Sequence, residues 1–254
     1  MAPATPSGRK TSRRGIVIGI GVAFAALLLG FLSQFATGSP DGGGAGDAAS
    51  DTAGSSGSEA DTYAQLAKLA RRDPGDKLAQ GRADAPVVMI EYADFGCSFC
   101  GKFARDTEPG LVKKYVDRGV LRIEWRNLPI FGKASERAAR ASWAAGRQGR
   151  FWEFHKAAYA DEDSKAKGFG AERLDALARE AGVDDLKRFR NDLDSAAARK
   201  AVRRDQQEGY RLGASSTPSF LVNGHPIAGA QPPEAFAQAI DAAREAAGRK
   251  AAGK

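Results

Sequence analysis

Cys97 and Cys100 are the only two cysteines of the 254-residue sequence, and they lie in the segment DFGCSFCGKF. Two cysteines at this spacing can form a structural disulfide, contribute to a metal site or act as a redox pair. A disulfide between them closes a very small loop, for which the chain-entropy relation gives only about 2 kcal/mol. A helix would already hold these residues together, so a purely structural bridge is a poor explanation of the pair.

A metal site is also poorly supported. Zinc usually takes four ligands, but the sequence offers one C-x-x-C pair and two histidines. His155 falls in an expected helix and His225 in an expected hairpin, without the spacing of a zinc motif. A c-type haem needs a histidine at position 101, where the sequence has Gly101. We therefore expect no metal and no other cofactor.

A redox pair fits the spacing best. Residues i and i+3 share one face of a helix, so two cysteines in a first turn can form a disulfide and separate again. Cys97 is expected at the start of a helix, beside free backbone N–H groups and the positive end of the helix dipole. Lowering a thiol pKa from about 8.5 to about 6 needs roughly 3.4 kcal/mol, of which an exposed dipole supplies about 1 kcal/mol. Direct N–H···S hydrogen bonds must supply the rest.

The elements around the pair are a strand, a helix and a second strand. Val87–Tyr92 is a β-rich run, and a helix is expected over 98–118 with a kink at Pro109. The segment VLRIEWRNLPI alternates apolar and polar residues, which predicts the second strand. A strand–helix–strand unit of this kind makes the two strands parallel.

A helical subdomain is predicted over about 134–212, because no strand signal appears there and apolar residues recur at helical spacing. One such buried face consists of Leu174, Leu177, Ala178 and Ala181, and another of Leu186, Phe189 and Leu193.

The segment PSFLVNGHPIAG predicts a hairpin that turns at Asn223-Gly224, with Pro226 assigning its second strand to a sheet edge or a bulge. The segment QPPEAFAQAIDAAREA predicts a closing helix.

The N-terminal region differs from the rest in composition. Residues 1–14 are basic and precede an uncharged apolar run, so we expect 1–14 to be cytoplasmic and 15–36 to be a transmembrane signal-anchor. A cleaved signal peptide is the alternative, and both export the remainder. Residues 37–61 have almost no large apolar side chain and are expected to form a flexible linker. A folded domain is then expected over 62–242, opening with a short amphipathic helix, and a ragged tail over 243–254.

Composition agrees with an ordinary globular domain, with 43% hydrophobic and 27% charged residues. A soluble surface rich in Arg and Lys explains the net charge of +7 best, and attraction to anionic lipid head groups or wall polymers outside a membrane is the alternative. Nucleic acid is not an expected partner, because no aromatic stacking platform accompanies the charge.

The sequence resembles the DsbA-like branch of the thioredoxin superfamily, in particular the membrane-anchored extracytoplasmic members of Gram-positive bacteria. The resemblance covers roughly residues 75–242 and is carried by DAPVVMIEYADFGCSFCGKF, FWEFHKAAYA and STPSFLVNGHPIAGAQPPEAF. It implies an α/β fold in which a thioredoxin-like mixed sheet contains an inserted helical subdomain.

The resemblance also implies roles for individual residues. Cys97 would be the exposed nucleophile and Cys100 the shielded resolving cysteine. Thr217-Pro218 would be the cis-proline loop that binds the peptide substrate. Glu91 matches a buried acid that assists proton transfer at the second cysteine, although a polar residue on the alternate strand face explains Glu91 equally well.

The dipeptide Ser98-Phe99 departs from the Pro-His of many strongly oxidising relatives. Phe99 cannot donate the hydrogen bond that such a histidine gives to the thiolate. We therefore expect the Cys97–Cys100 couple to be less oxidising than the strongest oxidases, with a reduction potential between about −120 mV and about −270 mV.

The resemblance implies an extracytoplasmic thiol–disulfide oxidoreductase in the cell membrane, forming disulfides in exported proteins through Cys97 and Cys100. A membrane partner of the DsbB or vitamin K epoxide reductase type would reoxidise it. A membrane-tethered disulfide reductase of the same fold is the alternative, and a peptide-binding or chaperone module without redox turnover is a further one.

Overall fold

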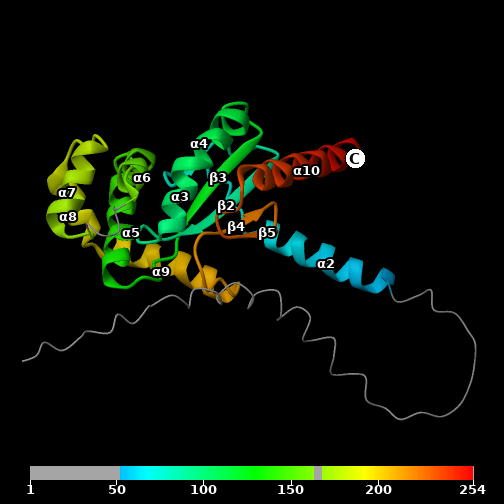
Figure 1. Cartoon of the computed structure of the whole chain (residues 1–254), viewed down its shortest axis with the longest axis horizontal. Coiled ribbons are helices and arrows are strands. Elements are labelled where there is room, and N and C mark those ends of the chain that lie inside the picture. The colour runs from blue at the N-terminus through cyan, green and yellow to red at the C-terminus, as the bar shows by residue number, and fades with distance from the viewer. Residues whose placement is uncertain (1–51, 163–167, 254) are drawn as a thin grey trace, which may run out of the picture. The chain divides into compact units, whose positions relative to one another are not determined.

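A five-stranded mixed sheet in the order β1-β3-β2-β4-β5 forms the centre of the fold (Figure 1). The computed structural model describes residues 52–162 and 168–253. The strands are β1 Ala79–Gln80, β2 Val87–Ala93, β3 Leu121–Asn127, β4 Ser219–Val222 and β5 His225–Ala228. Strands β2 and β3 are parallel, as the sequence predicts, whereas the other neighbours in the sheet are antiparallel.

The connection from β2 to β3 is helical. It comprises α3 Ser98–Asp106, α4 Glu108–Leu111 and the π-helical turn η2 Val112–Val116. The helix predicted over 98–118 is therefore divided, with its interruption at Thr107 and Pro109 in the first turn of α4. Proline has no backbone N–H to give to the preceding turn, which accounts for an interruption here.

The predicted hairpin is confirmed. Asn223 and Gly224 both have positive φ, 46° and 90°, as a type I′ turn requires. Pro226 lies in β5, which is an edge strand of the sheet. An edge strand tolerates proline because its outward N–H positions have no ladder partner.

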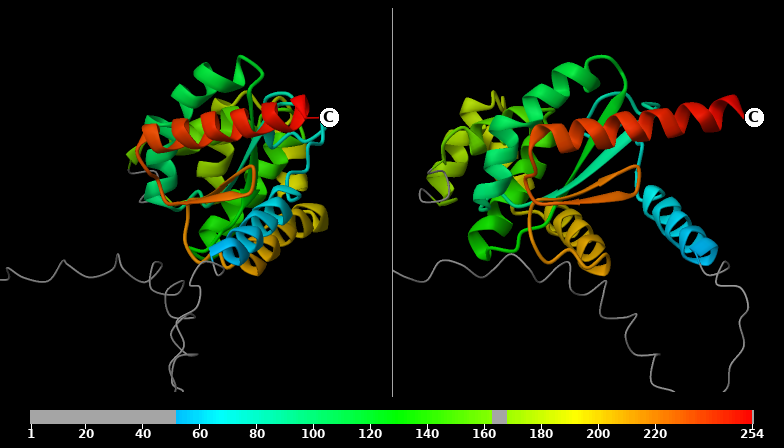
Figure 2. Two further views of the ribbon diagram at one scale, coloured as in Figure 1. Left: turned by 90° about the vertical axis from the view of Figure 1, so that its right-hand side faces the viewer. Right: turned by 45° about the vertical axis from the view of Figure 1, so that its right-hand side comes forward.

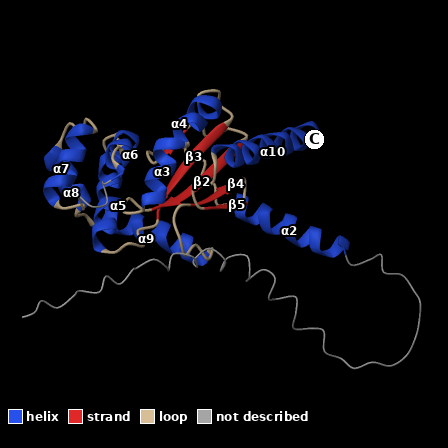
Figure 3. Ribbon diagram, viewed as in Figure 1, coloured by secondary structure: helices blue, strands red, loops and turns tan. Residues whose placement is uncertain are grey.

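In the residues that the structure describes, five helices lie between β3 and β4, and together they form the inserted subdomain (Figure 3). They are α5 Lys133–Gly146, α6 Phe151–Tyr159, α7 Ala171–Glu180, α8 Leu186–Leu193 and α9 Ala196–Arg211. The apolar faces of α5, α6, α7 and α8 pack into one cluster that also includes Phe95 and Trp125. Both predicted helical faces belong to this cluster, and Leu186 is the one residue of these two faces that is only partly buried.

The two faces of the sheet bury different side chains. On one face, Met89 and Phe220 pack with Phe103 of α3 and with Phe236 of the C-terminal helix, α10 Pro233–Ala252. On the other face, Ile90 and its neighbours pack against residues that follow helix α2 Thr52–Ala67. Residue Glu91 points to the first face, the same face as Met89, because side chains alternate along a strand.

The polar residues of β3 are buried rather than solvent-exposed, which simple alternation does not predict. Glu124 accepts hydrogen bonds from Arg122 Nε at 3.0 Å and Arg126 Nη2 at 2.8 Å. It also accepts from the backbone N–H of Arg71 at 2.9 Å. Arg126 in turn contacts Glu208 of α9 at 3.1 Å. This ion-pair network covers the face and joins β3 to α9.

Two predicted boundaries are wrong. Helix α2 begins at Thr52, inside the predicted linker 37–61. Helix α10 continues through the predicted tail 243–254 as far as Ala252. Once a packed turn exists, adding residues to a helix costs little, so helices extend past their packed core. The tail is rich in Ala, Arg, Glu and Lys, which are strong helix formers. Figure 2 shows α2 and α10 projecting past the hairpin.

The predicted segments 1–14 and 15–36 lie outside the described residues. Residues 37–51 of the predicted linker also lie outside them. Within the residues that the structure describes, no helix has the length and apolar character needed to cross a bilayer.

Candidate functional site

Cys97 is the N-cap residue of α3 and follows a tight turn at the end of β2. Asp94 builds this turn, because its Oδ1 accepts from the N–H of Gly96 at 2.7 Å and its carbonyl accepts from the N–H of Cys97 at 2.9 Å. Its second carboxylate oxygen accepts from the N–H groups of Ile130 and Phe131 at 2.7 and 3.0 Å. Asp94 thus fixes the cysteine turn to the loop after β3.

Cys97 has the contacts of an activated thiol. The backbone N–H of Cys100 donates to its Sγ at 3.4 Å, while the protonated Cys97 thiol donates to the carbonyl oxygen of Thr217 at 3.1 Å. The Cys100 thiol donates to Cys97 as well, and together with the Thr217 hydroxyl and the N–H groups of Cys100 and Phe99 it lowers the pKa of Cys97 to about 6. Burial acts in the opposite direction but is outweighed. Direct hydrogen bonds therefore favour the thiolate, as the sequence predicts.

Cys100 has the opposite character. It is fully buried, and burial raises its pKa well above the ordinary value, with further contributions from Cys97 and the Glu91 carboxyl. The two sulfur atoms are unbonded, so the structure is that of the dithiol. The proton is held on Cys100 and the negative charge is favoured on Cys97.

The expectation that Cys97 is exposed needs correction, because only 4% of the residue is accessible. The loop at Thr217-Pro218, whose peptide bond is cis, covers the sulfur from the side of β4. The adjacent residues Ser98 and Phe99 are exposed, and Phe99 presents 65% of its surface to solvent. The sulfur of Cys97 is therefore covered by the cis-proline loop, and the exposed side chain of Phe99 lies close to it in the chain.

Glu91 lies on β2, fully buried, and neither of its carboxylate oxygens has a hydrogen-bond partner. Burial, with a further contribution from the neighbouring Glu108 carboxyl, raises its pKa well above the ordinary value. Since Glu91 also raises the pKa of Cys100, the two groups interact. Glu91 is thus a buried carboxyl that interacts with Cys100, and its part in proton transfer stays a prediction.

Three more groups near the pair escaped the sequence analysis, namely Asp94, Glu108 and Tyr159. The Tyr159 hydroxyl donates to the Asp94 carbonyl at 2.8 Å, and its ring stacks on Phe95 with centroids 5.1 Å apart. Asp94 could have been suspected from its place in the turn, whereas Glu108 and Tyr159 come from other helices and have no local signal.

The two histidines are apart, as their sequence positions suggest. His155 is buried among aromatic rings, including those of Trp125 and Tyr159, and burial lowers its pKa to about 3. His225 lies on the edge strand against the ring of Tyr63, with centroids 4.3 Å apart. Among the described residues no cluster of three or more His, Cys, Asp or Glu side chains could hold a metal.

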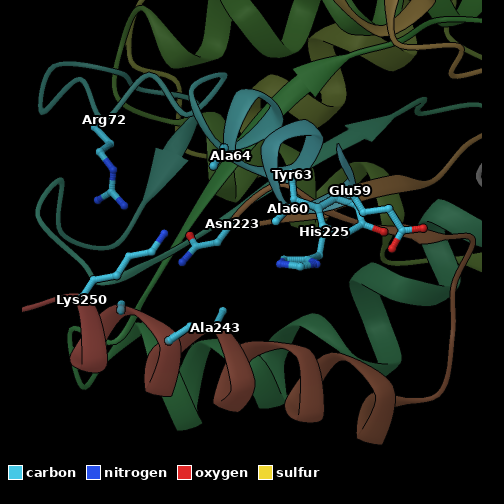
Figure 4. A pocket seen from close by; sticks show the side chains of 12 residues that line it. Glu59, Ala60, Tyr63, Ala64, Arg72, Asn223, His225, Ala243 and Lys250 are labelled. Carbon is cyan, nitrogen blue, oxygen red and sulfur yellow. The ribbon is translucent and has the colours of Figure 1, made fainter. Parts of the chain in front are cut away.

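A separate hollow of about 520 Å³ lies between α2, α10 and the hairpin. Figure 4 shows Tyr63 and Ala60 on one side of it, Ala243 and Lys250 on the other, and His225 beneath Tyr63. No cysteine and no residue of the cis-proline loop lines this hollow, so it is distinct from the thiol site.

Comparison with known proteins agrees with this geometry. Residues 73–242 match a family model described as thioredoxin. The probable disulfide bond formation protein D of Bacillus anthracis is 30% identical over 166 residues, covering 61% of this chain and 76% of that protein. The crystal structure of oxidised BdbD from Bacillus subtilis superposes with a TM-score of 0.62 at 24% identity, covering 67% of this chain and 94% of that one.

A longer relative is the Na(+)/H(+) antiporter NhaA 3 of Salinispora tropica, which is 34% identical over 173 residues. The match covers 66% of this chain but 25% of that protein, so the chain spans about a quarter of the length of the antiporter. The thioredoxin match extends over all five strands of the sheet, and the chain accordingly belongs to the thioredoxin family, in its DsbA-like branch.

Proposed function

We propose that this protein exchanges thiols and disulfides with exported polypeptides on the outer face of the cytoplasmic membrane, and that its main direction is disulfide formation. The observation that carries the proposal is the asymmetry of the pair. The thiolate is favoured on Cys97 and the proton is retained on the fully buried Cys100. Hydrogen bonds that stabilise the Cys97 thiolate stabilise the dithiol protein, and a stable dithiol makes its disulfide a stronger oxidant.

The reaction begins from the disulfide form. A substrate thiolate attacks Cys97 Sγ, the Cys97–Cys100 bond breaks, and its electron pair leaves on Cys100. A second substrate thiolate attacks the substrate sulfur of the mixed disulfide and releases Cys97 as a thiolate. The substrate has lost two electrons and gained a disulfide, and the protein has become the dithiol that the structure shows.

The surface around Cys97 suits an unfolded polypeptide. The large apolar side chains that are exposed in the described residues are Phe99, Phe131, Tyr210 and Leu212. Phe99 follows Cys97 closely, and the loop of Phe131 is held by Asp94. Gln206 donates to Tyr210 Oη and to the Pro129 carbonyl, both at 3.2 Å, so the end of α9 lies by the same loop. Apolar side chains exposed in unfolded substrates fit this apolar rim.

The membrane location rests on the basic and apolar residues of 1–36 in the sequence. The similarity to part of a sodium/proton antiporter adds support, since that relative joins a similar domain to a membrane transporter. The dithiol must be reoxidised, and we assign this step to a membrane oxidase of the DsbB or vitamin K epoxide reductase type.

The test uses the purified full chain, its two single cysteine variants and the variant that lacks both cysteines. Cys97→Ser should abolish both insulin reduction and oxidative refolding of a reduced substrate, whereas Cys100→Ser should accumulate mixed disulfides through Cys97. Full activity of the variant lacking both cysteines would instead identify a binding or chaperone module.

The direction is tested in cells by alkylation of the pair. An oxidase is mainly disulfide at steady state, and a mainly dithiol pair would identify the reductase alternative.

A further inference from the structure

Cys100 must gain and lose a proton during thiol–disulfide exchange, but its burial prevents direct proton exchange with bulk water. When a substrate thiolate opens the disulfide, the electron pair leaves on Cys100, and this sulfur must then gain a proton. In the reverse step Cys100 must lose that proton before its sulfur can attack Cys97. The Cys100 residue is fully buried, so bulk water does not reach it.

Glu91 is the first group able to exchange this proton. Its oxygens have no hydrogen-bond partner, and an unpaired carboxylate in a buried position costs several kcal/mol. The carboxyl is therefore neutral beside the thiol, ready to give a proton to a Cys100 thiolate. Glu91 is itself fully buried, however, and so it cannot recover a proton from bulk water.

Glu108 is the carboxyl group that interacts with Glu91 and also lines a cleft at the surface. The carboxyl groups interact, and two carboxyl groups at one site resist carrying two charges. Burial raises the pKa of Glu108 to about 8. The Gln80 amide donates to Glu108 Oε1 at 3.0 Å, and Oε2 lies 3.7 Å from His155 Nδ1. Because the pKa of His155 is about 3, this ring is neutral and Glu108 is the group that titrates.

Glu108 also lines a cleft of about 750 Å³ between α3, α4, η2 and α6. Trp152 Nε1 and His155 Nε2 border this cleft and are buried without a protein hydrogen-bond partner. Buried polar atoms of this kind are normally satisfied by ordered water. The remaining titratable and charged groups that line the cleft are Arg105, Lys113, Asp117, Lys156 and Tyr159.

We propose that Glu108 is the outer member of a proton route, which connects Glu91, and through it the buried Cys100, to water in this cleft. The inference rests on the proposed exchange function. In the oxidase direction, Glu91 gives its proton to the Cys100 thiolate, Glu108 reprotonates Glu91, and cleft water reprotonates Glu108. On reoxidation the same proton leaves in the opposite order, while the two electrons pass to the disulfide of the oxidising partner.

The experiment isolates the step that needs Cys100. Dithiol protein of the full chain is mixed with oxidised glutathione, quenched with acid and analysed by mass spectrometry, which separates the glutathione mixed disulfide from the closed Cys97–Cys100 disulfide. The variants are Glu91→Gln, Glu108→Gln and the double variant. Asp117→Asn is the matched control, since it removes an exposed carboxyl at the cleft rim.

At neutral pH we expect Glu108→Gln to slow closure of the mixed disulfide by at least about tenfold and to flatten its pH dependence. Iodoacetamide alkylation of Cys97 should stay within about twofold of the wild-type rate, which shows that the nucleophile is intact. The double variant should be no slower than Glu91→Gln, because two residues of one route are not additive. Asp117→Asn should match the wild type.

Closure in Glu108→Gln at the wild-type rate and pH dependence would overturn the route, as would additive effects in the double variant. Glu108→Asp guards against a folding defect, because it retains a titrating carboxyl and should recover most of the rate and its pH dependence. An Asp variant as slow as the Gln variant also overturns the route. If instead the wild type fails to reduce insulin or refold substrates, the proposed function itself fails.

Discussion

The Sγ atom of Cys97 lies 3.1 Å from the carbonyl oxygen of Thr217, which joins the first turn of α3 to the loop that precedes β4. The sheet explains this contact. Strands β2 and β4 are antiparallel neighbours with Tyr92 opposite Ser219, so the end of one strand and the start of the other meet at the same edge. The insertion of five helices between β3 and β4 leaves this meeting point unchanged.

Thr217 influences Cys97 through its hydroxyl as well as its carbonyl. The hydroxyl oxygen is buried and has no hydrogen-bond partner in the dithiol, yet it contributes to the lowered pKa of Cys97. A hydrogen bond to a charged group is worth about 1.5–3 kcal/mol. We therefore expect Thr217→Val to raise the pKa of Cys97 by about one unit or more, measured from the pH dependence of iodoacetamide alkylation. Thr217→Ser keeps the hydroxyl and should resemble the wild type. An unchanged pKa in the Val variant would contradict this assignment.

We expect Phe99 to keep the redox potential of the Cys97–Cys100 couple low, because its side chain has no hydrogen-bond donor for the thiolate. Its backbone N–H helps to stabilise the Cys97 thiolate, but its exposed ring has no donor to offer. Phe99→His should lower the pKa of Cys97 by about one unit and raise the redox potential by roughly 30 mV. Phe99→Leu, which removes the ring without adding a donor, should leave the potential within about 10 mV of wild type.

Glutathione titration of both variants and the wild type measures this effect. The wild-type value should fall between about −120 mV and about −270 mV, and a value of about −130 mV or higher would refute the prediction that Ser98-Phe99 moderates the couple.

Local sequence signals were sufficient for the thiol pair and the strands beside it. The pair, the parallel β2–β3 unit and the Asn223-Gly224 hairpin all depend on residues close together in the chain, and all are present. Glu108 and Tyr159 could not be found in this way. Each stands in an ordinary helical segment, and its relation to Glu91 or Asp94 arises only when α4 and α6 pack against the sheet.

The burial of the charged residues of β3 could not be predicted from local sequence either. A strand with Arg122, Glu124 and Arg126 on one face predicts a solvent-exposed face, because charged residues are seldom buried alone. Their partners Arg71 and Glu208 come from opposite ends of the domain. Only the tertiary fold brings them together and makes burial of the face favourable.

This network predicts how stability responds to acid. Burial alone would raise the pKa of Glu124, but hydrogen bonds from Arg71, Arg72 and Arg126 outweigh it and lower the pKa to about 2. A carboxyl with a lowered folded-state pKa stabilises the fold above its unfolded pKa, and this stabilisation is lost as the pH falls through the folded value. We expect roughly 3 kcal/mol of unfolding free energy to disappear between about pH 5 and about pH 2.

Urea denaturation at several pH values measures the loss. Glu124→Gln should be destabilised by about 3 kcal/mol or more at neutral pH, because it leaves two buried guanidinium groups short of a charge. Its stability should also fall less steeply with acid than that of the wild type. Asp84→Asn is the control, since the Arg82–Asp84 pair is exposed. An acid response of Glu124→Gln as steep as the wild type would show that Glu124 does not carry the effect.

Gly224 tests the docking of α2 on the hairpin. Its φ of 90° strains any other residue, and an added Cβ would lie 2.1 Å from the carbonyl oxygen of Tyr63 and 2.8 Å from the backbone N of Ala67. These are backbone atoms of α2, which cannot move aside without shifting the helix. Gly229, with φ of 72° and no atom within 4 Å of an added Cβ, is the matched control.

Gly229→Ala should therefore cost only the backbone strain, about 1 kcal/mol. Gly224→Ala should cost that strain and the displacement of α2 as well, so we expect a loss larger by about 2 kcal/mol or more. Urea unfolding measures both losses. Hydrogen exchange should show faster exchange in residues 59–67 for Gly224→Ala alone, with insulin reduction retained because the thiol site lies on other elements. Equal losses in the two variants would mean that α2 does not rest on Gly224.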